Sequence, residues 1–303
     1  MKIRLGTRGS RLAVIQSESV AAALRARGAE VEIVVIRTTG DRLAQVSLAD
    51  FGGKALFVKE IEEALLAGRV DVGVHSLKDM PSELPTALIL GAFPLREDPG
   101  DVLLGRRDGG WNALPAGAVV GTSSPRRRAM VLTHRPDLRT EPIRGNVDTR
   151  LEKLRAGSYD ALIMAAAGLK RLGLSPPHCT PLDPGEFVPA VGQGVLAVEA
   201  RQADRELLEV LRAVDDTRTR LAALAERAFL ARLGAGCHTP VAAHARLDGP
   251  GLVLTGVVSS PDGATMLRAS AEGSAVDGAR LGVALADELL AKGAKAVLDA
   301  SRG

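Results

Sequence analysis

The sequence contains few aromatic residues, only two cysteines and no long apolar stretch. Of its 303 residues, one is Trp, one is Tyr and five are Phe. Because proteins that hold single-stranded nucleic acid stack bases on aromatic side chains, this shortage argues against such a function. It also means that the cores must be built from Ala, Val, Leu and Ile. No apolar stretch approaches the roughly 18 residues of a membrane-spanning helix, so we expect no membrane partner.

The two cysteines, Cys179 and Cys237, lie far apart, and neither a zinc-ligand spacing nor a Cys-x-x-Cys pair is present. We therefore expect no metal site and no structural disulfide. The chain starts directly with a strand-like segment, residues 2–7, rather than with the apolar run of a signal peptide. These features lead us to expect a soluble, cytoplasmic protein.

Basic residues are numerous but are nearly balanced by acidic ones. The net charge of +3 is small for a protein that follows nucleic-acid phosphates, so we expect no nucleic-acid partner. Among the 39 basic residues, 31 are arginine. A guanidinium group grips carboxylate or phosphate through two parallel hydrogen bonds. The arginines are therefore informative where they cluster in motifs.

Strand and helix patterns alternate through the first two thirds of the chain, which predicts mixed, mostly parallel sheets covered by helices. A β-branched run at 31–36 predicts a buried strand, and Ser10 is suited to cap the first helix. Residues 173–186 are rich in Pro and Gly and predict a loop. The last segment predicts a small α+β domain with a three-stranded antiparallel sheet. We expect its strands at 241–247, 252–258 and 266–271, and its helices at 217–233 and 276–291.

The segment 75–81 follows an expected strand and contains Lys78 and Asp79. Sites in parallel sheets gather at the carboxyl ends of strands. Asp79 is therefore a candidate acid–base group, and Lys78 is a candidate anion ligand. A solvated turn of charged residues explains the same segment equally well.

Two further motifs combine arginines with helix starts. In 121–128 a strand ends in hydroxyl residues before a helix, where free N–H groups and arginines can converge on an anion. Arginines in a first helical turn oppose the helix dipole, which favours a binding role over helix stability. In 143–150, Arg144 and Arg150 flank a Gly-Asn turn, for which a charged surface turn is an equal alternative.

Cys237 lies in a Gly-rich segment, 233–240, that follows a predicted helix. It is either a small buried apolar residue or an accessible thiolate suited to a stable thioether. The segment 192–194 lacks the third glycine and the helix of a dinucleotide-binding loop, so we reject nucleotide binding there.

Taken together and in order, these motifs resemble the porphobilinogen deaminase family, also called hydroxymethylbilane synthase. The matching segments run from residue 4 to about 240, and beyond them the likeness is only in general pattern. They are 7–10, 52–60, 75–81, 121–127, 144–150, 166–173, 189–194, 225–230 and 236–237. The departures are Gly9, Arg11, Pro125 and Ala235, of which Pro125 removes one N–H donor near the expected anion site.

The resemblance implies three domains and a monomer. Two domains are expected to be lobes like those of periplasmic binding proteins, joined by hinges at 94–101 and near 190–200. The third is expected to present the cofactor cysteine, and the loop 42–56 to act as a lid. The corresponding ranges are 1–95 with 195–213, then 100–190, then 217–303.

The resemblance also implies a reaction of porphyrin and heme biosynthesis. Four molecules of porphobilinogen are joined head to tail into hydroxymethylbilane, with release of ammonia, on a covalently bound dipyrromethane. By motif match the cofactor thioether falls on Cys237 rather than Cys179, and the catalytic aspartate falls on Asp79. We expect Asp79 beside the pyrrole nitrogens, where positive charge develops during the reaction.

The substrate carries an acetate and a propionate, so a growing chain of rings is strongly anionic and needs basic ligands. The residues implied to bind the cofactor are Ser10, Ser76, Lys78, Thr122, Ser124, Arg126, Arg127, Arg144, Gly145 and Asn146. Those implied to bind the incoming substrate are Arg8, Arg150, Arg171 and Gln193. A simple carboxylate-binding protein is the alternative, and the intact mass separates the two because a binder carries no covalent adduct.

Overall fold

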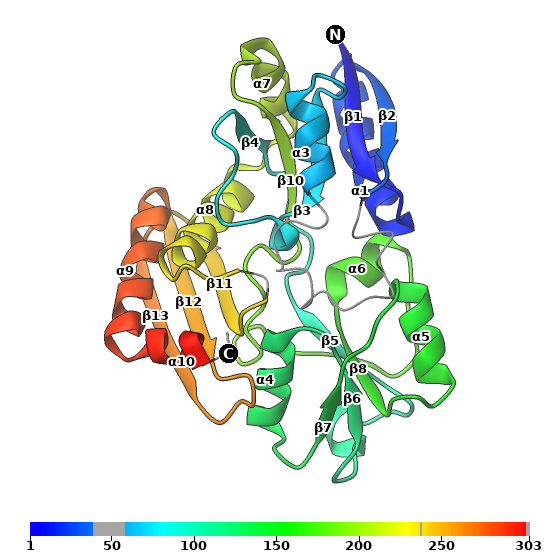
Figure 1. Ribbon diagram of the computed structural model, residues 1–303, viewed down its shortest axis with the longest axis vertical. Helices are drawn as coiled ribbons and strands as arrows, with labels where there is room; N and C mark the ends of the chain where they lie inside the picture. The colour runs from blue at the N-terminus through cyan, green and yellow to red at the C-terminus, as the bar shows by residue number, and fades with distance from the viewer. Residues whose placement is uncertain (39–57, 237, 301–303) are drawn as a thin grey trace. The chain divides into compact units, whose positions relative to one another are not determined.

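The computed structural model describes residues 1–38, 58–236 and 238–300, and the chain divides into two compact units (Figure 1). Unit 1 comprises Met1–Glu97 and Gly194–Arg220, and unit 2 comprises Asp98–Gln193 and Leu221–Gly303. Two of the divisions fall inside 94–101 and 190–200, the segments expected to be hinges. The expected lid at 42–56 lies outside the described residues. The three-domain ranges stay a prediction.

Unit 1 is built on a five-stranded sheet of order β2-β1-β3-β10-β4. Pairing is parallel between β1 and both β2 and β3, and antiparallel between β10 and both β3 and β4. Four strands therefore run in one direction and β10 is reversed, so the expected mixed, mostly parallel sheet is confirmed. The strands are β1 (Lys2–Arg8), β2 (Glu30–Ile36), β3 (Val72–Ser76), β4 (Leu88–Ala92) and β10 (Leu196–Arg201).

Helices cover both faces of this sheet because apolar residues alternate along its strands. On one face, α1 (Arg11–Arg25) packs Val20 and Leu24 into a core that contains Ile3 and Val72. On the other face, α3 (Lys59–Leu66) packs Ile61 and Leu65 against the sheet. The helix α7 (Arg205–Leu211), which the sequence did not reveal, adds Leu207 and Leu211 to the first of these cores.

The strand β2 corrects one expectation. The run 31–36 was expected to be buried, yet β2 lies at the edge of the sheet and Val35 is 54% exposed. An edge strand has only one neighbour, so part of its apolar surface stays in contact with water. A run of β-branched residues therefore indicates a strand but not its place in the sheet.

Unit 2 contains a second five-stranded sheet of order β7-β6-β8-β5-β9. Here β5 is the reversed strand, because it pairs antiparallel with β8 and β9 while β6 pairs parallel with β7 and β8. The predicted loop at 173–186 is wrong at one place, where three residues form β9. The strands are β5 (Asp101–Gly105), β6 (Val119–Gly121), β7 (Arg139–Glu141), β8 (Ala161–Ala165) and β9 (Cys179–Pro181). The helices are α4 (Pro125–His134), α5 (Val147–Arg155) and α6 (Ala166–Arg171).

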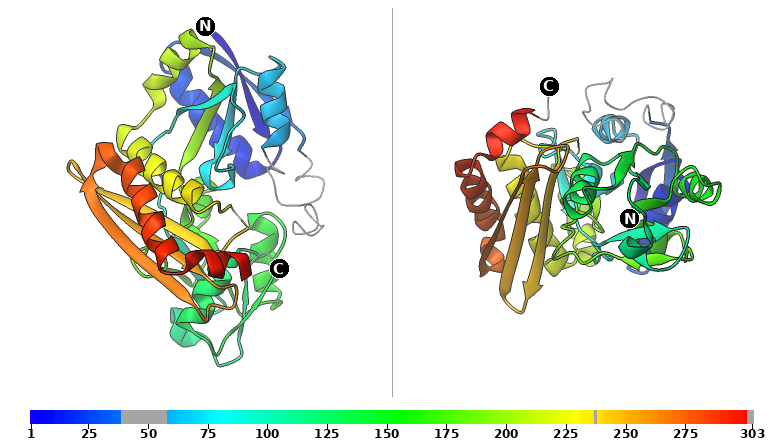
Figure 2. Two further views of the ribbon diagram at one scale, coloured as in Figure 1. Left: turned by 60° about the vertical axis from the view of Figure 1, so that its left-hand side comes forward. Right: turned by 90° about the horizontal axis from the view of Figure 1, so that it is seen from below.

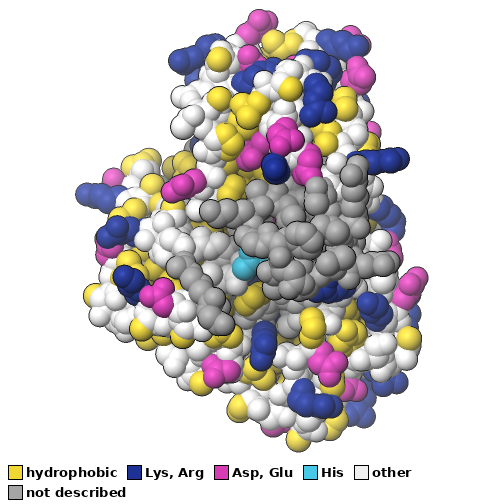
Figure 3. Space-filling model, in the orientation of Figure 1, with side chains coloured by type: hydrophobic (Ala, Val, Ile, Leu, Met, Phe, Trp, Pro, Cys, Tyr) yellow, Lys and Arg dark blue, Asp and Glu magenta, His cyan; other side chains and the backbone are white. Residues whose placement is uncertain are grey.

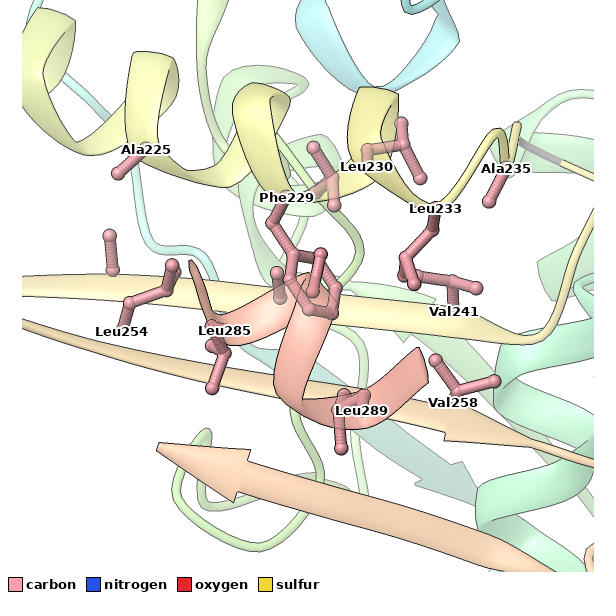
Figure 4. Close-up of a cluster of buried hydrophobic side chains, with 14 of the residues drawn as sticks. Ala225, Phe229, Leu230, Leu233, Ala235, Val241, Leu254, Val258, Leu285 and Leu289 are labelled. Carbon is pink, nitrogen blue, oxygen red and sulfur yellow. The ribbon is translucent and has the colours of Figure 1, made fainter. Parts of the chain in front are cut away.

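Unit 2 also contains the expected antiparallel sheet of β11 (Val241–Asp248), β12 (Gly251–Ser259) and β13 (Met266–Ser274). The helices α8 (Thr217–Arg232), α9 (Gly278–Ala291) and α10 (Ala294–Ala300) share a core with it, and Figure 2 shows α8 and α9 against one face. Phe229 points from α8 onto β12 (Figure 4), where a Cβ on Gly256 would lie 2.6 Å from its ring. Ala242 and Val257 join the core of the five-stranded sheet. The expected small α+β element is thus confirmed.

None of the helices in the described ranges is long and apolar enough to cross a membrane.

Candidate active site

Lys78 and Asp79 stand on a short 3-10 turn, Leu77–Asp79, that directly continues β3. Leu77 and Met80 are only 2% and 4% exposed and anchor the turn in unit 1. The Leu77 N–H donates to Val195 O at 3.0 Å, and the Met80 N–H donates to Leu77 O at 3.1 Å. Between these anchors Asp79 is exposed and Lys78 is half-buried. The turn therefore presents the carboxylate to solvent from a backbone that is fixed at both ends.

The neighbouring strand β1 ends in Arg8, and Ser10 caps α1 by accepting a hydrogen bond from the Ala13 N–H at 3.3 Å. Because β1 and β3 are parallel neighbours, their carboxyl ends meet at one edge of the sheet. Gln16 Nε2 donates to Ser76 Oγ at 3.1 Å and so ties α1 to the end of β3. Sequence reasoning did not single out Gln16. Unit 1 thus gathers its predicted site residues at one sheet edge: Arg8, Ser10, Ser76, Lys78 and Asp79.

In unit 2, β6 ends at Gly121 and α4 begins at Pro125. Ser124 caps α4, since its Oγ accepts from the Arg127 N–H at 3.4 Å. Thr122 is 6% exposed, and its Oγ1 accepts from the Ser124 N–H at 3.2 Å. The hydroxyl groups of Thr122 and Ser124 therefore form the start of α4.

Arg126 and Arg127 point inward rather than presenting free forks, being only 3% and 8% exposed. Arg126 Nη2 donates to Asp101 Oδ2 at 2.6 Å, and Arg127 Nη2 donates to Asp101 Oδ1 at 2.7 Å. Gln193 Nε2 donates to the same carboxylate at 2.9 Å. Asp101, Arg126, Arg127 and Gln193 together form what we call the Asp101 centre. The sequence led us to expect arginines converging on a helix start that is open to an anion, but one acidic residue already lies between them. Sequence reasoning did not single out Asp101.

The Asp101 centre contains more positive charge than negative charge. Burial raises the pKa of Asp101, but the charges of Arg126 and Arg127 outweigh it and hold that pKa at about 2. Burial lowers the pKa of Arg126, and the Asp101 charge opposes this change. Two guanidinium groups therefore share one carboxylate, and one positive charge stays uncompensated within the Asp101 centre. Arg126 Nε is buried and has no hydrogen-bond partner among the described residues.

The third motif lies on the turn before α5. Asn146 caps α5 by accepting from the Thr149 N–H at 2.9 Å, and Gly145 has a φ of +108° that a side chain would strain. Arg150 folds back and donates from Nε to Gly145 O at 2.9 Å. Burial and the nearby charge of Arg127 lower the pKa of Arg150. Arg150 therefore adds a further positive charge beside the Asp101 centre.

The family of this chain follows from its similarity to known proteins. The description "Porphobilinogen deaminase, dipyromethane cofactor binding domain" matches residues 3–209, and "Porphobilinogen deaminase, C-terminal domain" matches residues 220–291. The porphobilinogen deaminase of Nitratidesulfovibrio vulgaris (strain DSM 19637 / Miyazaki F) is 49% identical over 98% of this chain and 96% of its own. That of Roseiflexus sp. (strain RS-1) is 50% identical over 97% of each chain. The chain belongs to the porphobilinogen deaminase family.

The chain is therefore an enzyme, a transferase of tetrapyrrole biosynthesis, and the reaction of the family is the polymerisation of porphobilinogen to hydroxymethylbilane on dipyrromethane. Among solved structures, the methionine-binding protein MetQ is 11% identical over 72% of this deaminase and 92% of its own chain, with a TM-score of 0.46.

The dipyrromethane of the deaminase carries carboxylates, and the residues of unit 2 fit such a group. The observation that supports the fit is the uncompensated positive charge of the Asp101 centre, together with the orphaned Arg126 Nε. Arg144 is half-buried on the turn before α5, and Arg171 is half-buried at the end of α6. Gln193 is 1% exposed and binds Pro99 O and Gly100 O besides Asp101, so it mainly orders the backbone around the arginines.

Of the two cysteines, Cys237 lies outside the described residues. The turn that flanks it is held by Thr239 Oγ1, which donates to Gly236 O at 2.6 Å. Cys179 is exposed in β9, and burial raises the pKa of its thiol, which reduces the fraction of reactive thiolate. At the same pH, Cys179 is therefore less often a thiolate than an unperturbed cysteine.

Sequence reasoning also missed a buried carboxylate in unit 2. Glu226 of α8 is 0% exposed and accepts hydrogen bonds from the Gly192 N–H at 2.7 Å and the Ala245 N–H at 2.8 Å. It joins α8, β11 and the segment that contains Gln193. The only signal for it was its place in the matching segment 225–230. No group of His, Cys, Asp or Glu within the described ranges is arranged to hold a metal ion.

Proposed function

We propose that Asp79 is the catalytic residue of this deaminase. The observation that carries the proposal is the exposed carboxylate on a fixed turn, at the sheet edge that also contains Arg8, Ser10 and Lys78. The bound dipyrromethane supplies the pyrrole carbon to which the first substrate is joined. The incoming substrate loses its amino group as ammonia, and its methylene carbon then bonds to the free ring carbon. Asp79 balances the positive charge on the pyrrole nitrogens and receives the proton that this ring carbon loses. Lys78 and Arg8 bind substrate carboxylates at the same edge.

The cofactor is held by Cys237 through a thioether and by the polar groups that the resemblance implies for it. In unit 2 the Asp101 centre, Thr122, Ser124 and the turn 144–146 receive its carboxylates, and Arg150 and Arg171 receive those of the substrate. In unit 1, Ser10, Ser76 and Lys78 contribute. Gln193 acts on the substrate side through its hold on the backbone at 99–100.

The enzyme works as a cytoplasmic monomer whose two units move about 94–101 and 190–200 as the product grows. Size-exclusion chromatography with light scattering tests the monomer. On the face drawn in Figure 3, basic side chains are scattered among acidic ones, which supports a small-molecule substrate rather than nucleic acid.

Replacing Asp79 tests the catalytic assignment. Asp79→Asn keeps the shape of the turn and removes the charge, so turnover should fall by at least roughly 100-fold, because preorganised charge stabilisation is worth that much. Glu83→Gln, an exposed acid four residues further on, is the matched control and should retain turnover. Turnover of Asp79→Asn near that of the control would sink the assignment.

Intact mass tests the attachment residue. The purified Cys237→Ser protein should lack the dipyrromethane adduct, while Cys179→Ser should retain it. The reverse result would move the thioether to Cys179.

A further inference from the structure

Three titratable side chains are buried together in unit 1, and none has a role in the proposed function. Glu62 of α3, His75 of β3 and Glu199 of β10 are 8%, 5% and 0% exposed. His75 Nε2 lies 3.1 Å from Glu199 Oε2. Glu62 is electrostatically coupled to both residues, since burial and the charge of Glu199 raise its pKa to about 7 and His75 opposes the shift.

The strand register brings His75 and Glu199 together. In the antiparallel pair of β3 and β10, Glu199 lies opposite Gly73, and His75 lies opposite Ala197. Because side chains alternate, His75 and Glu199 occupy the same face as diagonal neighbours. A Cβ on Gly73 would lie only 2.9 Å from His75 Nε2 and 2.6 Å from Ile61. Glycine at 73 therefore leaves the space that the imidazole ring fills.

This arrangement is costly for a core. His75 Nε2, both carboxylate oxygens of Glu199 and Glu62 Oε1 are buried without a hydrogen bond of ordinary geometry. Burying such groups is unfavourable, and apolar residues of similar size often give equal or greater stability. The nearby Arg201, two residues after Glu199 in β10, donates instead to Leu65 O, Val70 O and Asp71. Stability alone therefore does not account for the buried pair.

The pair lies near the carboxyl end of β3, the strand that leads to Asp79. His75 is followed by Ser76, the last residue of β3, and then by the turn Leu77–Asp79. That turn is fastened to the start of β10 by the Leu77 N–H on Val195 O. The position of Asp79 therefore depends on how β3 is held against β10, and His75 with Glu199 is a close contact of buried polar side chains between these two strands.

We propose that Glu199 and His75 form a positioning pair that fixes the carboxyl end of β3 against β10 and so holds Asp79 in its reactive position. The inference rests on the proposed role of Asp79. Neither residue of the pair contacts the substrate, so losing the pair acts on turnover rather than on substrate binding.

A double-mutant cycle with His75→Gln, Glu199→Gln and the double variant tests the pair. Each single variant should lower kcat roughly tenfold and leave KM within about twofold, because the lost interaction serves the transition state only. The kcat of the double variant should lie within about twofold of that of the slower single variant, since the effects of replacing two partners of one contact are not additive. A kcat near that of the wild type in either single variant, or losses that multiply to roughly 100-fold in the double variant, would overturn the inference.

Matched measurements separate this test from failures of folding or of the proposed function. Glu63→Gln, an exposed residue on α3 beside Glu62, is the control and should retain kcat. Intact mass and melting temperature confirm that each variant is folded and loaded. If Glu199→Gln does not fold, Glu199→Asp keeps the charge but shortens its reach, and it should also lower kcat with KM unchanged. An unchanged kcat in Glu199→Asp would overturn the inference. If Asp79→Asn is inactive while the cycle shows no effect, only the positioning pair is wrong; an active Asp79→Asn refutes the proposed function itself.

Discussion

Individual charged residues of this chain are used in opposite ways in the two units. Asp79 is exposed on a turn whose neighbours Leu77 and Met80 are buried, so its carboxylate meets solvent. Asp101 is 1% exposed and serves as the counter-charge of Arg126 and Arg127. The same residue type is therefore presented to solvent in one place, where we propose that it is catalytic, and is a structural ion in the other, and burial decides which.

Removing the charge of Asp101 should destabilise the protein strongly. Asp101→Asn leaves two buried guanidinium groups without a counter-ion, and breaking a buried ion pair costs about 3–5 kcal/mol. Because the folded pKa is lowered to about 2, Asp101 stabilises the fold above its unfolded pKa of 3.8. That contribution is lost as the pH falls from 3.8 through 2. Urea unfolding of Asp101→Asn and of the wild type should show the difference at pH 7 and a smaller difference at pH 3, and equal curves at pH 7 would contradict it.

Glu62 should have the opposite pH dependence. Its pKa is raised from 4.5 to about 7 by burial, so the buried neutral form is fully favourable below 4.5 and is lost as the pH rises through 7. Glu62→Gln stays neutral and should show a smaller fall in melting temperature between pH 5 and pH 8 than the wild type. The exposed Glu63→Gln should follow the wild type. A parallel fall in all three proteins would show that Glu62 ionises normally.

At the scale of whole elements, most of the fold could be predicted from periodicity and caps, and the exceptions have physical causes. Ser10 was predicted correctly as a cap because the signal is local. The strands β7 and β9, with three residues each, are too short to show alternation. β2 showed a buried-strand pattern but lies at an edge, which depends on partners far away in sequence.

In the candidate site, too, local signals could be predicted from the sequence, whereas partners from distant elements could not. The motifs indicated Asp79 and the arginines, but they did not indicate that Asp101, Glu199 or Glu226 would be buried partners. Each of these three stands among apolar residues in a strand or helix, and its role arises only when a distant element supplies the matching charge or N–H. Pairing of this kind cannot be derived from one sequence without the packing.

Glu226 gives a prediction about elements. Glu226→Ala removes the acceptor of the Gly192 and Ala245 N–H groups and leaves both buried, which costs roughly 1–3 kcal/mol for each amide. Glu226→Gln keeps one amide oxygen and should lose about half as much. Chemical denaturation measures both, with the exposed Glu288→Gln as the control. Stability of Glu226→Ala equal to that of the control would show that these amides find other partners.

For the molecule as a whole, the two five-stranded sheets share one plan, with a single reversed strand in the fourth position of each order. The chain passes between the units three times, at Glu97–Asp98, Gln193–Gly194 and Arg220–Leu221. Gln193 joins the first two passages within unit 2 by donating to Pro99 O and Gly100 O, and the Glu97 N–H on Gly194 O joins them within unit 1. The third passage lies inside α8.

The charge balance of the whole molecule leads to a prediction about the cofactor-free protein. In unit 2, Arg126, Arg127 and Arg150 are buried or partly buried, and Asp101 compensates only one of their charges. Without the cofactor carboxylates the remaining charge lacks a partner, so an anion that binds only the folded protein should stabilise it by mass action. Phosphate should therefore raise the melting temperature of Cys237→Ser more than that of Cys179→Ser, which retains its adduct. Sodium chloride at matched ionic strength controls for screening, since a bound anion acts beyond it. An equal rise in melting temperature in both variants would mean that the cofactor carboxylates do not pair with this positive charge.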